Sequence, residues 1–298
     1  IPRSVPVVAS VAEAMVYGPQ VAVVGLAPSG GALPEGVRQS VLEALRNGLS
    51  VVSGLHTKLA TDLELQAQVQ PGCWIWDLRQ EPAGLGVAAA RAAALPCRRI
   101  LAVGTDMSVG KMSAALELTA AARQRGLDAR FVGTGQAGIL IAGGGIPLDA
   151  VRVDYAAGAV EKAVMQVAEG AGEESLVFVE GQGSFCHPGS TATLPLMRGS
   201  QADTLLLVHR AGQRSIRNFP EIALPPLPEL ITVVEALARL ARPQGQPVAR
   251  VNAIALNTAL LDESEAAAAI AQTTEETGCC CADPVRGGAE RLLEALLS

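Results

Sequence analysis

Short apolar runs alternate with longer stretches of helical periodicity along most of the chain. The apolar runs end at Gly, Pro, Asp or Asn, which is typical of strands buried in a parallel sheet. The predicted strands are 21–28, 49–55, 73–78, 100–103, 129–132, 176–179, 204–209, 248–256 and 279–282. The predicted helices are 35–47, 62–69, 114–125, 229–242 and one that begins near Tyr155. This alternation predicts an α/β fold with a doubly wound, mainly parallel sheet.

The length of 298 residues predicts two domains, because a single core seldom grows that large. A connector rich in Pro, Gly and Ala lies at 81–97. We place the boundary near residue 97. This gives a small N-terminal Rossmann-like α/β domain with its connector over 1–97, and a larger domain over 98–298.

A glycine-rich loop joins the predicted strand at 100–103 to the helix that follows it. Glycines let successive backbone N–H groups point inward, while a helix start and a lysine add positive charge. The loop therefore predicts a P-loop NTPase-like domain that holds a diphosphate or triphosphate. The predicted contacts are Gly104, Thr105, Asp106, Ser108, Val109, Gly110, Lys111, Met112 and Ser113.

The residue after Lys111 is Met112, where phosphate-binding loops usually have Ser or Thr whose hydroxyl binds magnesium. A thioether is a poor ligand for this hard cation, and a hydroxyl returns only at Ser113. We expect the loop to hold phosphates well and a metal less conventionally. If magnesium is required, Ser113 and Glu180 are the predicted ligands, with Asp106 beside them.

Three titratable side chains are candidates for the reacting centre. Glu180 follows an apolar strand, where doubly wound sheets bind ligands, so it is predicted to be a base or metal ligand, or otherwise a cap or ion-pair partner. Asp106 either takes part in catalysis or shapes the loop through its side chain. His187 is either a base, since imidazole exchanges protons near neutral pH, or a structural loop residue.

Further polar residues are candidates for ligand binding. Asn257 ends a predicted strand and is expected to bind an adenine edge, or else to form a turn. Arg79 and Arg286 are predicted to clamp a carboxylate or phosphate, with surface ion pairs as the alternative. Gln136 and Gln182 complete the predicted substrate contacts.

Composition narrows the class of protein. Charged residues make up 17% of the chain, hydrophobic residues 49%, and the formal net charge is −6. No apolar run has the roughly 18 residues that a membrane span needs, no secretory signal is evident, and the scattered basic residues argue against a nucleic-acid partner. We expect a cytoplasmic enzyme. The six cysteines show no zinc-binding spacing and are predicted to be small buried hydrophobes.

Several segments spread over nearly the whole chain together resemble one P-loop family, the DgcN-type D-glutamate N-acetyltransferases. The resemblance includes Met112 and implies acetyl transfer from acetyl-CoA to the amino group of an acidic D-amino acid. Locally, the phosphate loop and Glu180-Gly181-Gln182-Gly183 also resemble dethiobiotin synthetase, which implies an amide-forming ligase or kinase that uses ATP and Mg²⁺. The segments of the wider resemblance are 53–56, 77–79, 104–112, 134–136, 180–183, 187–188, 256–258 and 283–286.

Coenzyme A carries a diphosphate and a ribose 3′-phosphate, so a loop without the usual metal hydroxyl can hold it through backbone N–H groups and Lys111. We therefore favour an N-acetyltransferase that takes acetyl-CoA and D-glutamate. An ATP- and magnesium-dependent ligase or kinase stays open, as does a nucleotide-gated regulatory protein, because a P-loop shows only what is bound. We expect a homo-oligomer whose N-terminal domain either closes over the site or dimerises.

Overall fold

The computed structural model describes residues 5–26 and 32–298. Its two compact units are Ile1–Glu81 and Pro82–Ser298, and each is described by itself. The division lies at Glu81/Pro82 rather than near residue 97.

The connector belongs to the larger unit because its side chains and backbone are bonded there. Ala92 and Cys97 are buried in the core of that unit. The carboxylate of Glu161, which is fully buried, accepts hydrogen bonds from the backbone N–H groups of Ala89 (3.2 Å) and Arg91 (2.6 Å) and from the Arg91 side chain. These long-range bonds have no signature in the composition of the connector.

The smaller unit is built around a three-stranded parallel sheet of order β1-β2-β3. Its core is formed largely by α2 and the strands, with Leu42, Leu45 and Val51 almost fully buried. The end of the predicted strand 21–28, including Pro28, lies outside the described residues. The elements are α1 (Val11–Ala14), β1 (Val21–Val24), α2 (Glu35–Arg46), β2 (Ser50–Ser53), α3 (Leu63–Gln66) and β3 (Ile75–Asp77).

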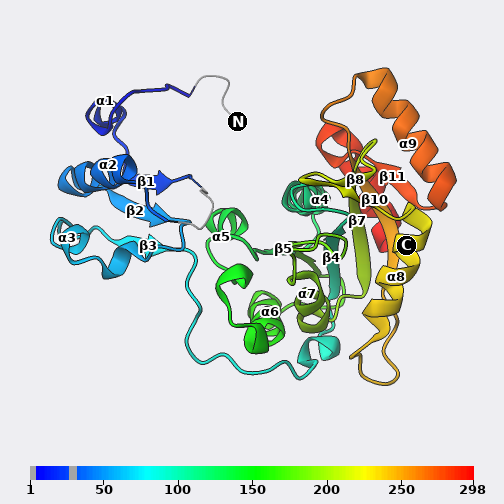
Figure 1. The fold of residues 1–298 in the computed structure, drawn as a ribbon. Coiled ribbons are helices and arrows are strands. Elements are labelled where there is room, and N and C mark those ends of the chain that lie inside the picture. The colour runs from blue at the N-terminus through cyan, green and yellow to red at the C-terminus, as the bar shows by residue number, and fades with distance from the viewer. Residues whose placement is uncertain (1–4, 27–31) are drawn as a thin grey trace. The chain divides into compact units, whose positions relative to one another are not determined.

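The larger unit is built on a six-stranded, entirely parallel sheet of order β11-β10-β7-β4-β6-β5 (Figure 1). The predicted doubly wound fold is confirmed. Because β4 lies inside the sheet, with β7 on one side and β6 on the other, the loop that follows it has strand ends on both sides. The strands are β4 (Arg98–Gly104), β5 (Ala129–Val132), β6 (Leu176–Val179), β7 (Thr204–Arg210), β10 (Arg250–Asn257) and β11 (Cys280–Ala282).

Helices cover both faces of this sheet. On one face, α4 (Lys111–Gln124) and α10 (Ala289–Leu297) pack on alternate strand residues such as Ile100 and Ala102. On the other face, α6 (Val153–Val167), α7 (Thr193–Ser200), α8 (Leu227–Arg239) and α9 (Glu263–Thr277) pack on the intervening residues, such as Leu101 and Val103. Burial on both faces explains why the strands are continuously apolar.

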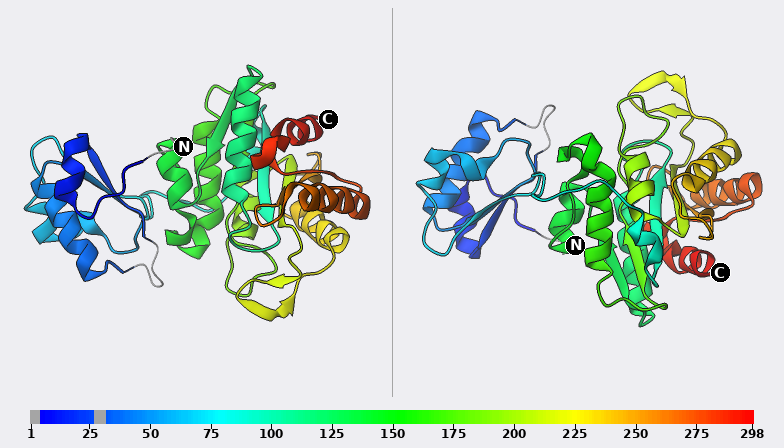
Figure 2. Two further views of the ribbon diagram at one scale, coloured as in Figure 1. Left: turned by 90° about the horizontal axis from the view of Figure 1, so that it is seen from above. Right: turned by 90° about the horizontal axis from the view of Figure 1, so that it is seen from below.

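Several elements differ from the sequence prediction. Helices α5 (Gln136–Ala142), α7, α9 and α10 were not predicted, although α9 has a capping box of Asp262 and Glu265 that the sequence could have shown. The proline-rich stretch after β7 contains strand β9 (Phe219–Ala223), which pairs antiparallel with β8 (Ser215–Ile216) and projects as the yellow hairpin in Figure 2. Within the described residues, no helix is long and apolar enough to cross a membrane.

Candidate functional site

The phosphate loop begins where β4 ends at Gly104 and runs into α4 at Lys111. Five residues separate Gly104 from Gly110, one more than in the common G-x-x-x-x-G-K pattern. Gly110 has φ of +112°, a conformation that favours glycine. The neighbouring strand ends hold the loop, because Asn257 donates to the carbonyl oxygen of Val109 (2.9 Å) and Arg210 donates to that of Ser108 (2.7 Å).

Lys111 is a buried cation with its ammonium turned back onto the loop. Its Nζ donates to the carbonyl oxygen of Asp106 (2.8 Å), and only 6% of the residue is exposed. Burial lowers the pKa of Lys111 to about 8, although the charges of Asp106 and Glu180 act in the opposite direction. Two glycines make room for this side chain, since a Cβ on Gly104 would lie 2.8 Å from Nζ and one on Gly181 2.7 Å from Cδ.

Asp106 shapes the loop. One carboxylate oxygen accepts from the backbone N–H of Met107 (2.7 Å), and the other accepts from the side chain of Gln213 (2.6 Å) and the backbone N–H of Arg217 (2.9 Å). Asp106 therefore ties the loop to Gln213, which precedes the β8–β9 hairpin, and to Arg217 in the turn of that hairpin. This geometry supports the loop-shaping alternative over a catalytic role.

A second buried layer supports Thr105. Its hydroxyl shares a 3.0 Å hydrogen bond with Nδ1 of His209 at the end of β7, and its carbonyl oxygen accepts from the hydroxyl of Ser184 (2.8 Å). Burial lowers the pKa of His209 to about 4, so the ring is neutral at physiological pH. His209 thus supports the loop without adding charge.

Glu180 lies just after β6, against the start of α5. One of its oxygens accepts from the backbone N–H groups of Thr134 (2.7 Å) and Gly135 (3.1 Å), and the other accepts from the side chain of Gln182 (3.2 Å). Burial raises the pKa of Glu180, while the two N–H groups and Lys111 partly offset that effect. The carboxylate is thus part of a helix cap and also a buried titratable group beside Lys111. A Cβ on Gly138 would lie 2.1 Å from this carboxylate, so α5 needs glycine there.

His187 is buried, and its ring meets Phe219 edge to face. Its Nδ1 accepts from the backbone N–H of Gly189 (3.1 Å), so the neutral ring carries its hydrogen on Nε2. A ring in this tautomer donates from Nε2 and has no lone pair there to take a proton. The geometry favours a hydrogen-bond donor over the predicted base.

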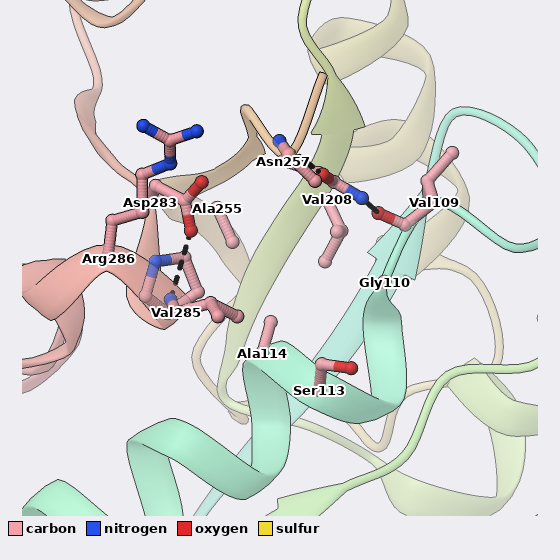
Figure 3. Close-up of a pocket in the computed structure, with 12 residues that line it drawn as sticks. Val109, Gly110, Ser113, Ala114, Val208, Ala255, Asn257, Asp283, Val285 and Arg286 are labelled. Carbon is pink, nitrogen blue, oxygen red and sulfur yellow. Dashed lines mark hydrogen bonds between the residues drawn. The ribbon is translucent and has the colours of Figure 1, made fainter. Parts of the chain in front are cut away.

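A pocket of about 230 Å³, here called the Asn257 pocket, opens beside the loop toward β10 and β11 (Figure 3). Asn257 is occupied on both sides of its amide, since its oxygen accepts from the backbone N–H of Ala259 (3.1 Å) while its nitrogen donates to Val109. Arg286, which was predicted to contact the substrate, lines this pocket together with residues that were predicted to bind the cofactor. The main lining residues are Val109, Gly110, Ser113, Asn257, Asp283 and Arg286.

A second pocket of about 360 Å³, here called the Gln182 pocket, opens beside the loop toward β6. Met107 of the phosphate loop lines this pocket. Gln182 also lines it, and the Gln182 side-chain amide donates a hydrogen bond to Glu180. The phosphate loop therefore contributes to two pockets on different sides. The main lining residues are Met107, Asp149, Gln182, Gly183, Ser190 and Thr191.

The predicted magnesium ligands have different neighbours. Ser113 lines the Asn257 pocket, whereas Glu180 is bonded to Thr134, Gly135 and Gln182. Met112 packs against the apolar core on the α4 face of the sheet. In the described ranges 5–26 and 32–298, no three His, Cys, Asp or Glu side chains gather as a metal site.

The remaining predicted residues lie elsewhere. Gln136 is the first residue of α5, and Arg79 follows β3 in the smaller unit. Their roles as substrate contacts stay predictions. Cys97 and Cys281 are buried as predicted and the other four cysteines are only partly buried, while burial raises the pKa of Cys281 to about 12.

Sequence reasoning missed several residues that build the site. Gln213 and Ser184 each bond a loop residue from far along the chain, and Asp283 holds the backbone and hydroxyl of Thr258. Of these three residues, Asp283 alone directly follows a predicted strand, and that position was its signal in the sequence.

Comparison with known proteins places this architecture in a family. Residues 86–293 match the description "Domain of unknown function (DUF1611_C) P-loop domain", and residues 1–81 match "Domain of unknown function (DUF1611_N) Rossmann-like domain". A crystal structure of a DUF1611 family protein from Anabaena variabilis is similar, with a TM-score of 0.94 and 52% identity over 100% of this chain and 85% of that chain.

Two curated relatives carry an activity in their names. The D-glutamate N-acetyltransferase of Tritonibacter scottomollicae is 36% identical over 95% of this chain and 83% of its own length. That of a Pseudoalteromonas species is 33% identical over 96% and 84%. These relatives identify the chain as an acyltransferase and support N-acetyl transfer. With both of its domains matched, the chain belongs to the DUF1611 family.

Proposed function

We propose that this protein transfers an acetyl group from acetyl-CoA to the amino group of D-glutamate. The observation that carries the proposal is the phosphate loop with a pocket on each side, the Asn257 pocket and the Gln182 pocket. A two-substrate transfer needs both reactants held together. The names of the two curated relatives supply the substrate class.

Coenzyme A fits the chemistry of the loop. The backbone of the glycine-containing loop, the start of α4 and Lys111 suit a diphosphate. Binding this anion would oppose the effect of burial on Lys111 and keep its ammonium charged. Because Met112 packs into the core and offers no hydroxyl, the loop relies on these donors more than on a metal bound in the usual way.

We assign the adenosine end of coenzyme A to the Asn257 pocket and the amino acid to the Gln182 pocket. In the reaction, the amine nitrogen attacks the thioester carbonyl, the C–N bond forms, the C–S bond breaks, and the thiol of coenzyme A leaves. The amine must lose a proton. Glu180 is our candidate acceptor, because it is a buried carboxylate bonded to the Gln182 amide that lines the acceptor pocket.

The test compares acetyl-CoA with magnesium ATP in thermal unfolding. A ligand that binds only the folded protein stabilises it by about 2.7 kcal/mol at a hundredfold excess over Kd. We expect a rise in Tm with acetyl-CoA and release of thiol when D-glutamate is added. A rise with magnesium ATP alone would overturn the proposal in favour of the ligase or kinase, and no rise with either would mean that the loop holds neither carrier.

A further inference from the structure

We propose that Arg286 binds the ribose 3′-phosphate of coenzyme A and thereby makes this enzyme select coenzyme A over carriers that lack that phosphate. The inference rests on the proposed function and deepens it, since it names what distinguishes the donor. It moves Arg286 from the amino acid, where the sequence placed it, to the far end of the carrier.

Arg286 shares one continuous pocket wall with the phosphate loop. Asn257 bonds the carbonyl oxygen of Val109, and a Cβ on Gly110 would lie 3.5 Å from its Nδ2. The next residue, Thr258, presents its carbonyl oxygen to Nη2 of Arg286 (3.2 Å). Figure 3 shows Val109 and Gly110 on one side of this pocket and Arg286 on the other. A nucleotide whose diphosphate lies on the loop and whose base enters the pocket brings its ribose toward Arg286.

A constrained turn holds the backbone of Arg286. The carbonyl oxygen of Asp283 accepts from the N–H groups of Arg286 (3.2 Å) and Gly288 (2.9 Å). Gly287 has φ of +90°, which favours glycine, and a Cβ on Gly288 would lie 2.7 Å from the same Asp283 oxygen. The turn is therefore specific to its sequence and presents Arg286 from a defined position.

The guanidinium keeps donors for a ligand. Nη2 donates to the carbonyl oxygens of Thr258 and Leu261 (2.6 Å), which fixes the plane of the group. Among the residues that the structure describes, no acceptor bonds Nε or Nη1. An arginine has five N–H donors in a planar fork that matches a phosphate, so an exposed, oriented edge remains.

The charges in the pocket agree with this assignment. The acidic group in the lining, Asp283, directs its oxygens to Val285 N–H (2.9 Å), Thr258 N–H (2.9 Å) and the Thr258 hydroxyl (2.5 Å). Its hydrogen-bonding capacity is thus largely used by Thr258 and by its own turn. Arg286 is the basic residue in the lining, so its positive charge would stabilise a second phosphate that lies outside the loop.

The experiment measures the Kd of coenzyme A and of dephospho-coenzyme A by calorimetry, because the two ligands differ only in the 3′-phosphate. The parent should bind coenzyme A about tenfold or more tightly, as expected for hydrogen bonds to a charged group. Arg286→Gln should reduce this preference to about twofold or less, and Arg286→Lys should keep part of it. Arg214→Gln, an exposed arginine outside the pocket, is the matched control and should leave the preference unchanged.

The ratio of two affinities on the same variant cancels any general loosening of the turn. A parent that binds both carriers equally, or an Arg286→Gln variant that keeps the parental preference, overturns the role of Arg286 while acetyl transfer stands. A parent that binds neither carrier overturns the proposed function itself.

Discussion

The two pockets beside the phosphate loop are built from different kinds of residue. In the Asn257 pocket, Asn257 and Asp283 hydrogen-bond mainly to backbone groups, so these parts of the wall are fixed, while Arg286 keeps N–H donors for a ligand. In the Gln182 pocket, the amide of Gln182 donates to Glu180, a buried carboxylate. Burial raises the pKa of Glu180, and the neighbouring N–H groups and Lys111 lower it. The comparison indicates that one side recognises a carrier and the other performs chemistry. Substitutions on the two sides should therefore separate binding from turnover.

The largest effect is expected from Glu180→Gln. The amide keeps the shape and can still accept from Thr134 and Gly135, but it cannot take a proton, so kcat should fall about a hundredfold or more while the KM for acetyl-CoA stays near its parental value. Steady-state kinetics measures both constants. Glu174→Gln, an exposed carboxylate just before β6, is the control. A Glu180→Gln enzyme that turns over at the parental rate would leave Glu180 with only its capping role.

Lys111→Met should weaken acetyl-CoA binding about tenfold or more, because it removes the buried cation beside the loop. The same change should stabilise the unliganded protein by about 1 to 3 kcal/mol near neutral pH, since burial opposes the charge that the lysine carries there. Calorimetry measures the affinity for acetyl-CoA, and chemical unfolding measures the stability of the unliganded protein. A less stable Lys111→Met variant would show that the bond from Nζ to Asp106 outweighs the cost of burial.

The affinity for acetyl-CoA should also depend on pH. Lys111 in the free protein has its pKa lowered to about 8, so below that pH it already carries the charge that the phosphates need. As the pH rises through about 8 the free lysine loses its proton, and Kd should increase by up to about tenfold per pH unit. Lys111→Met should bind acetyl-CoA with a flatter profile. An equally steep rise in Kd for that variant would assign the titration to another group.

A smaller effect is expected from Gln182→Ala. Loss of one neutral hydrogen bond costs about 0.5 to 1.5 kcal/mol, so the KM for the amino acid should rise roughly two- to tenfold. The KM for acetyl-CoA should not change, which is the reverse of the pattern expected for Arg286→Gln. If Gln182→Ala raises the acetyl-CoA KM instead, the roles of the two pockets have to be exchanged.

Local patterns were enough for the sheet and the phosphate loop. Continuous apolar strands, the glycines at 104 and 110, and Lys111 are read within short windows, because burial on both faces and phosphate binding each impose a local residue pattern. Elements whose signals are weak in one window were missed. Helix α5 contains Gly138, which reads as a loop but is required by the nearby Glu180 carboxylate.

The α/β class, the parallel strands, the phosphate loop and the position of Glu180 after a strand all follow from the order of the amino acids. The contacts that these groups make follow from the three-dimensional packing. Asp106 is tied to Gln213 across 107 positions, and Arg286 joins the Asn257 pocket through Thr258, 28 positions away. Such partners are brought together by the order of strands in the sheet, which depends on how whole faces pack and is not encoded in the spacing of any one segment.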